Sequence, residues 1–148
     1  QGAQFSHIFC TCGSGGTSAG TVLGASLYMP DSKVTCAMVD ADDFTEIVPG
    51  LIKQAAELLG VDTAVPDFDL VDVCGPGYSI PSQEGNEAIS MMMKKEGIVL
   101  DTCYTGKAFG ALIKAARSGA FKPEDNVLFI HTGGAGGLFA QEWENIEL

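Results

Sequence analysis

The chain has 148 residues, which suffices for one domain with a buried core, and 46% of its residues are hydrophobic. Its formal net charge of −11 argues against a surface for nucleic acid or for an anionic membrane. Its apolar runs are too short for a membrane helix and no signal peptide is evident, so we expect a cytoplasmic protein.

Segments typical of strands and helices alternate from the start of the chain. Residues 6–12 are a short apolar run closed by a glycine, which is typical of a buried strand. Residues 17–29 have the apolar spacing of a helix and are ended by a proline. A second buried strand is predicted at residues 34–39, and the acidic residues 40–43 suit the cap of a helix that runs to about Leu59.

The alternation continues in the second half of the chain. A short strand at residues 68–73 is interrupted by two aspartates and is expected at an edge of the sheet. Helices are predicted at residues 82–96 and from about residue 105 to about residue 118. A strand at residues 127–130 and a short helix at residues 138–143 follow. This order predicts one α/β domain over residues 1–148, with three layers (αβα) and a mostly parallel sheet covered on both faces.

The five cysteines are Cys10, Cys12, Cys36, Cys74 and Cys103. Their number is odd and three of them lie in apolar strand-like runs, so we expect buried reduced thiols. The spacing Cys10-x-Cys12 is not that of zinc ligands, and we expect no metal site.

A glycine-rich turn separates the first predicted strand from the first predicted helix. It consists of Gly13, Ser14, Gly15, Gly16 and Thr17. The N–H groups of a first helical turn lack intrahelical partners, and the helix dipole adds partial positive charge there. Glycines let the backbone approach a phosphate closely, and the two hydroxyl groups can donate further hydrogen bonds. We therefore predict that this turn binds a phosphate, in the simplest case that of a cofactor.

Two further stretches are expected beside this turn. The loop around Tyr78 and the glycines after Thr132 both follow predicted strands. Ligands of open parallel sheets bind at the carboxyl ends of the strands. We therefore expect all three stretches to converge on one cleft.

A dinucleotide is one candidate ligand. Gly13-x-Gly15 begins the dinucleotide fingerprint and Asp40 closes the next strand, where an acid that binds ribose belongs. However, Ser18 stands in place of the third glycine, and the hydroxyl groups of the turn suit a terminal phosphate monoester better. One hypothesis for the function is therefore a non-catalytic Rossmann-like module, in which this turn binds a phosphate or a nucleotide.

Five motifs in a fixed order carry a resemblance to a known family. They are Gly13-Ser14-Gly15-Gly16-Thr17-x-Ala19-Gly20, Gly77-Tyr78-x-Ile80-Pro81, Glu96-Gly97-Ile98-x-Leu100-Asp101, Tyr104-Thr105-Gly106-Lys107-Ala108 and Phe129-Ile130-His131-Thr132-Gly133-Gly134. Together they resemble the C-terminal half of the D-cysteine desulfhydrase and 1-aminocyclopropane-1-carboxylate (ACC) deaminase family of pyridoxal-phosphate enzymes. The resemblance covers nearly the whole chain. It implies part of the large domain of a tryptophan-synthase β-like fold, known as fold type II.

The resemblance also implies roles for single residues. Residues 13–17 match the segment that holds the phosphate of pyridoxal 5'-phosphate, and Thr132 matches a residue near the pyridine nitrogen. Tyr78 and Tyr104 match tyrosines on the substrate side, where they would be catalytic. A hydroxyl group beside the ring nitrogen would leave that nitrogen largely neutral, which suits elimination of a leaving group from the β-carbon.

The residue after Tyr104 separates two branches of this family. The deaminase branch has a glutamate there, whereas this chain has Thr105. The resemblance therefore favours α,β-elimination of D-cysteine to pyruvate, sulfide and ammonia, with ACC deamination as the alternative.

The lysine that forms the Schiff base in this family lies in the N-terminal half, and no lysine of this chain matches it. Lys107 lies in a motif, but we interpret it as a structural residue in an ion pair or at a helix start. We therefore expect the chain to be a C-terminal fragment or one half of a split enzyme, without the small domain and inactive alone. Its expected partners are a small amino-acid substrate and the segment or chain with that lysine, within a homodimer when complete.

Overall fold

The computed structural model of the protein describes residues 3–140. Strands and helices alternate along these residues, as the sequence predicts. The elements in chain order are β1 (His7–Cys12), α1 (Gly16–Tyr28), β2 (Lys33–Met38), α2 (Phe44–Leu59), β3 (Asp69–Asp72), α3 (Gln83–Glu96), α4 (Thr105–Arg117), β4 (Val127–Phe129) and α5 (Ala135–Phe139).

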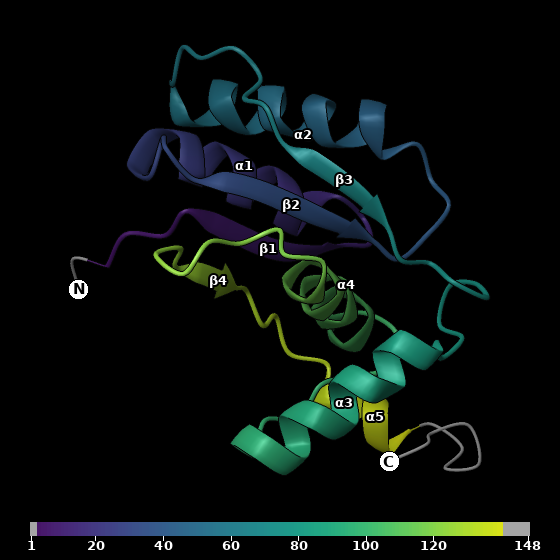
Figure 1. The fold of residues 1–148 in the computed structure, drawn as a ribbon. Coiled ribbons are helices and arrows are strands. Elements are labelled where there is room, and N and C mark those ends of the chain that lie inside the picture. Colours follow the sequence, from purple (N-terminus) through teal and green to yellow (C-terminus); the bar gives the residue numbers. More distant parts are fainter. Residues whose placement is uncertain (1–2, 141–148) are drawn as a thin grey trace.

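The described strands form one sheet in the order β3-β2-β1-β4, and each neighbouring pair is parallel (Figure 1). The register of β1 on β2 runs from His7 opposite Lys33 to Cys12 opposite Met38. Strand β3 lies at an edge, as its two interrupting aspartates predict. Because every pair is parallel, the loops after the strands open at the same edge of the sheet.

Helices α1 and α2 cover one face of the sheet (Figure 1). Ile8, Cys10 and Cys12 of β1 point into this layer, where they are buried with side chains from both helices. The predicted burial of Cys10, Cys12 and Cys36 is confirmed, and all five cysteines are free thiols. This larger apolar core holds β1 in place and so fixes the turn that follows it.

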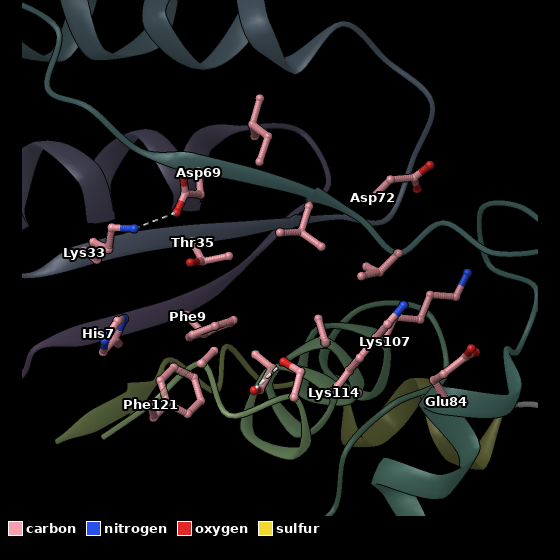
Figure 2. Close-up of a pocket in the computed structure, with 18 of the residues that line it drawn as sticks. His7, Phe9, Lys33, Thr35, Asp69, Asp72, Glu84, Lys107, Lys114 and Phe121 are labelled. Carbon is pink, nitrogen blue, oxygen red and sulfur yellow. Dashed lines mark hydrogen bonds and ion pairs between the residues drawn. The ribbon is translucent and has the colours of Figure 1, made fainter. Parts of the chain in front are cut away.

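Helix α4 packs on the other face, and α3 packs on α4, which completes the three layers (Figure 1). A second apolar cluster joins Ala88 and Ile89 of α3 to Leu100 and Leu138. Met92 and Met93 of α3 pack against this cluster. Helix α4 covers this face only in part and leaves a cleft of about 690 Å³ between itself and the sheet (Figure 2).

The starts of α3 and α5 are each determined by a residue just before the helix. Ser82 caps α3, because its hydroxyl group accepts a hydrogen bond of 3.1 Å from the N–H of Gly85. The last described helix, α5, begins at Ala135, three residues before the predicted start. Its N-cap is Gly134, which adopts a left-handed conformation with φ of 96° that glycine allows. Part of the predicted helix 138–143 lies outside the described residues. Between residues 3 and 140, no helix has both the length and the apolar character that a membrane span needs.

Candidate active site

A cavity of about 580 Å³ lies at the carboxyl edge of the sheet. The loops after β1 and β4 and the loop that carries Tyr78 all contribute to it, so the three stretches singled out in the sequence do meet. The lining residues are Thr11, Gly13, Ser14, Thr17, Asp40, Asp42, Tyr78, Asp101, Tyr104, Thr132, Gly133 and Gly134. The larger cleft on the sheet face is a different space, and its lining includes none of the predicted site residues.

The start of α1 faces this cavity. Gly15 is its N-cap and accepts the first helical hydrogen bond from the N–H of Ala19 at 2.8 Å. No side chain caps this helix and its first turn holds no acidic residue. Its first N–H groups are therefore free to bind an anion, and the helix dipole favours one. Ser14 and Thr17 are exposed and place their hydroxyl groups at the same wall.

Two of the five predicted turn residues, Gly15 and Gly16, are not among the residues that line the cavity. Gly15 has φ of 86°, and a Cβ atom there would be 2.9 Å from Ile47 Cγ2 and 3.1 Å from Leu51 Cδ1 of α2. Gly15 therefore allows the turn to pass close to α2. Gly16 is the first helical residue and contributes backbone only. Thus Gly13, Ser14 and Thr17 line the cavity, whereas Gly15 and Gly16 shape the turn.

Tyr78 and Tyr104 form a pair that also lines the cavity. Their ring centroids are 5.9 Å apart with planes at 72°, and their hydroxyl groups are hydrogen-bonded to each other. This hydrogen bond, followed by burial, raises the pKa of Tyr104 above its ordinary value. The Tyr104 hydroxyl group therefore stays protonated at neutral pH and holds its proton more tightly than a free tyrosine does.

Asp101 fixes the turn that carries Tyr104, a role that sequence reasoning missed. This buried carboxylate accepts hydrogen bonds from the N–H groups of Cys103 at 2.8 Å and Tyr104 at 2.7 Å. It also accepts from Thr105, from the N–H at 2.8 Å and from the hydroxyl group at 2.6 Å. An aspartate followed by a helix that begins with threonine was the available signal, because such residues bind nearby N–H groups.

Asp101 also lies against the glycines after β4. A Cβ atom on Gly134 would be 2.6 Å from Asp101 Cγ, so only a glycine fits there. His131 holds the same turn from its other side. Its Nε2 donates to the carbonyl of Val99 at 2.9 Å, and its Nδ1 accepts from the N–H of Gly133 at 3.0 Å. Thr132 is thus carried to the cavity by a turn that is fixed at both ends.

Lys107 departs from its expected role in one respect. It lies in the first turn of α4, as predicted, but it forms no ion pair with any residue of the described part of the chain. Its Nζ donates instead to the carbonyl groups of Cys74 at 2.6 Å and Gly77 at 2.7 Å. Sequence patterns miss such partners because they report neighbours along the chain.

The donor set of the cavity fits a phosphorylated ring with an uncharged nitrogen. One wall offers N–H and hydroxyl donors of the kind that a phosphate binds, and Thr132 offers a neutral hydroxyl group. Thr11 Oγ1 is buried and has no hydrogen-bond partner among residues 3–140. The carboxylates of Asp40 and Asp42 complement a cationic ammonium group such as that of an amino acid. Within the described residues, no cluster of three or more His, Cys, Asp or Glu side chains could hold a metal ion.

Comparison with known proteins agrees with this chemistry. Residues 1–133 match the family model described as "pyridoxal-phosphate dependent enzyme". The solved structure of an ACC deaminase homologue matches with a TM-score of 0.83 at 39% sequence identity. The match covers 93% of this chain and 42% of that one. The chain therefore spans less than half the length of this relative.

Proposed function

Because the chain belongs to the pyridoxal-phosphate-dependent enzyme family, we propose that it supplies the phosphate-binding and substrate-facing walls of an enzyme that acts on a small amino acid. One observation carries the proposal. The uncapped start of α1, the tyrosine pair and Thr132 line a single cavity. The chain covers 42% of its solved relative. We propose that the lysine that binds the cofactor comes from another segment or chain, and that the complete enzyme is a cytoplasmic homodimer.

In this proposal each wall has one task toward pyridoxal 5'-phosphate. The N–H groups of the turn 13–17, with the hydroxyl groups of Ser14 and Thr17, would bind the phosphate. The Thr132 hydroxyl group would lie by the ring nitrogen and leave it uncharged. When bound, the cofactor supplies an electron sink for the α-carbon of the substrate.

We propose D-cysteine as the substrate. In the elimination, the α-carbon would lose its proton to the lysine supplied by the other segment or chain, and the electrons of that C–H bond would form a double bond between the α- and β-carbons. The bond between the β-carbon and sulfur breaks, and sulfur leaves with the electron pair of that bond. The Tyr104 hydroxyl group, which lines the cavity, would give its proton to the departing sulfur. Tyr78 would hold that hydroxyl group in place through the hydrogen bond between them. The products are sulfide, pyruvate and ammonia, and the last two form when water hydrolyses the product left after sulfur departs.

The environment of Thr105 supports this choice over the deaminase reaction. Thr105 is buried, and its hydroxyl group is bound to Asp101 rather than open to the cavity. This position therefore offers no acid or base at the site, whereas the deaminase branch carries a glutamate there. The likeness to an ACC deaminase homologue supports ACC as the second candidate substrate.

The test uses the intact protein that contains this chain, loaded with pyridoxal 5'-phosphate. Separate reactions receive D-cysteine, L-cysteine and ACC, and each is assayed for sulfide, pyruvate and 2-oxobutanoate. Sulfide and pyruvate from D-cysteine support the proposal, whereas 2-oxobutanoate from ACC supports the second candidate. If the protein shows no visible absorbance of a bound cofactor after incubation with pyridoxal 5'-phosphate, but binds phosphate or a nucleotide in a separate titration, it is instead the non-catalytic module.

A further inference from the structure

Lys107 is a buried cation whose partners are two backbone carbonyl groups. It is 1% exposed and lies in the first turn of α4, three residues after Tyr104. Its Nζ donates to the oxygen atoms of Cys74 at 2.6 Å and Gly77 at 2.7 Å. Lysine is almost never fully buried unless it is paired. Its burial here therefore depends on these two bonds.

The two carbonyl groups belong to consecutive turns of the loop that carries Tyr78. The oxygen of Cys74 also accepts from the N–H of Gly77, and the oxygen of Gly77 accepts from the N–H of Ile80, both at 3.3 Å. Ser79 has φ of 60°, a conformation that costs energy for a residue other than glycine. Tyr78 itself is 47% exposed. Packing alone therefore holds this loop weakly, and Lys107 ties both of its turns to α4.

The other tyrosine of the pair, Tyr104, is fixed at the start of the same helix. Asp101 binds the N–H of Tyr104 at 2.7 Å, and α4 begins at the next residue. Asp101 therefore places Tyr104 relative to the helix, while Lys107 places Tyr78 relative to the same helix. Hydrogen-bonded hydroxyl groups on two separate loops need both attachments, because a shift of either loop would part them.

We propose that Lys107 is a positioning residue that ties the Tyr78 loop to α4 and so holds the Tyr78 and Tyr104 hydroxyl groups together. The attachment itself stands on the contacts above. Its value for catalysis rests on the proposed function, in which this pair faces the substrate.

The first test measures the tyrosine pair without cofactor. In the intact protein, Lys107→Met removes the donor, and Lys114→Met is the matched control because Lys114 is an exposed lysine of the same helix (Figure 2). Nitration of Tyr104 by tetranitromethane is followed by peptide mass spectrometry. The tyrosinate is the reactive form, so each unit by which the pKa of Tyr104 falls speeds nitration by about tenfold. We expect faster nitration in Lys107→Met and in Tyr78→Phe, and no change in Lys114→Met.

A double variant separates positioning from a general loosening of the fold. If Lys107 acts through Tyr78, then Lys107→Met adds nothing to the nitration rate of Tyr78→Phe. An unchanged rate in Lys107→Met, beside a faster one in Tyr78→Phe, overturns the proposal. Should Lys107→Met not fold, Lys107→Gln replaces it. This variant keeps a shorter donor and should give an intermediate rate, and a rate equal to that of the unsubstituted protein overturns the proposal.

The activity of the loaded protein then tests the catalytic consequence. We expect kcat with D-cysteine to fall by about tenfold to a hundredfold in Lys107→Met, because small misplacements of catalytic groups cost this much. Lys107→Arg, which keeps the donors, should recover part of that loss. Faster nitration without turnover of any amino acid would support the attachment and contradict the proposed function. Turnover with unchanged nitration would support the function and contradict the attachment.

Discussion

The hydroxyl groups of Tyr78 and Tyr104 are hydrogen-bonded to each other across 26 residues of sequence. One tyrosine lies in a loop that leads to α3, and the other lies at the start of α4. Because α3 and α4 pack together, the two loops are brought to the same wall of the cavity. The pair is thus a product of the tertiary fold, and the hydrogen bond from Tyr78 raises the pKa of Tyr104.

Replacing Tyr78 by phenylalanine should change how stability depends on pH. The hydrogen bond from Tyr78, and then burial, raise the pKa of Tyr104 above 10.0, so the folded state holds this proton more tightly than the unfolded state. Its contribution to stability is complete below pH 10.0 and is lost as pH rises above that value. In Tyr78→Phe, the free energy of unfolding should fall less as the pH rises above 10.0, because the pKa of Tyr104 is raised less. Urea denaturation at a series of alkaline pH values measures this free energy.

The matched control for this series is Tyr28→Phe, because Tyr28 is 82% exposed. Its stability should follow that of the unsubstituted protein at each pH. Equal slopes for Tyr78→Phe and the unsubstituted protein would contradict the assigned cause of the raised pKa.

Replacing Asp101 by asparagine should destabilise the domain and displace Tyr104. The carboxylate receives two hydrogen bonds on each oxygen, and an amide group can accept on one oxygen only. Two buried donors would then face an NH₂ group. We expect a loss of about 2–4 kcal/mol in the free energy of unfolding, measured by urea denaturation. Asp42→Asn is the control because Asp42 is exposed, and a comparable loss there would contradict the explanation.

The sequence was sufficient for the architecture because strand and helix periodicity are local signals. The alternation of apolar runs predicted the parallel sheet, and the topology then predicted that the loops meet at one edge. The attachments of those loops were not predictable in the same way. Lys107 binds the carbonyl group of Cys74, which lies 33 residues away along the chain. Because every residue has a backbone carbonyl group, the sequence does not indicate which one a lysine will bind. The carboxylate of Asp101 was visible as part of a motif, but its bonds depend on the turn that it stabilises.

Alanine at Gly15 and at Gly16 should have opposite effects, although the two residues are neighbours. Gly15 has a positive φ, and a Cβ atom there meets Ile47 at 2.9 Å, whereas Gly16 has nothing within 4 Å. We expect Gly15→Ala to cost about 2–3 kcal/mol of stability, and Gly16→Ala to be neutral or stabilising by up to about 1 kcal/mol. Thermal and urea unfolding of the two variants measure the difference. Equal stability of both would show that the turn adopts another conformation.

Removing the hydroxyl groups of the glycine turn should weaken binding of the cofactor phosphate. Ser14→Ala and Thr17→Val each delete one donor from the cavity wall without changing the backbone. We expect each to lower the affinity of the intact protein for pyridoxal 5'-phosphate by about fivefold to tenfold, since one hydrogen bond contributes about 1 kcal/mol. Fluorescence titration measures the affinity.

Pyridoxal without phosphate separates this explanation from a general effect on the site. Its affinity should be the same in all variants, because it has no group for the turn to bind. Ser26→Ala is the control variant, since Ser26 is bonded to the carbonyl of Leu23 within α1 and does not line the cavity. If Ser14→Ala and Thr17→Val lower the affinity for pyridoxal as much as that for pyridoxal 5'-phosphate, the two hydroxyl groups do not bind the phosphate group. A selective loss for the phosphate would assign the uncapped start of α1 as its binding site.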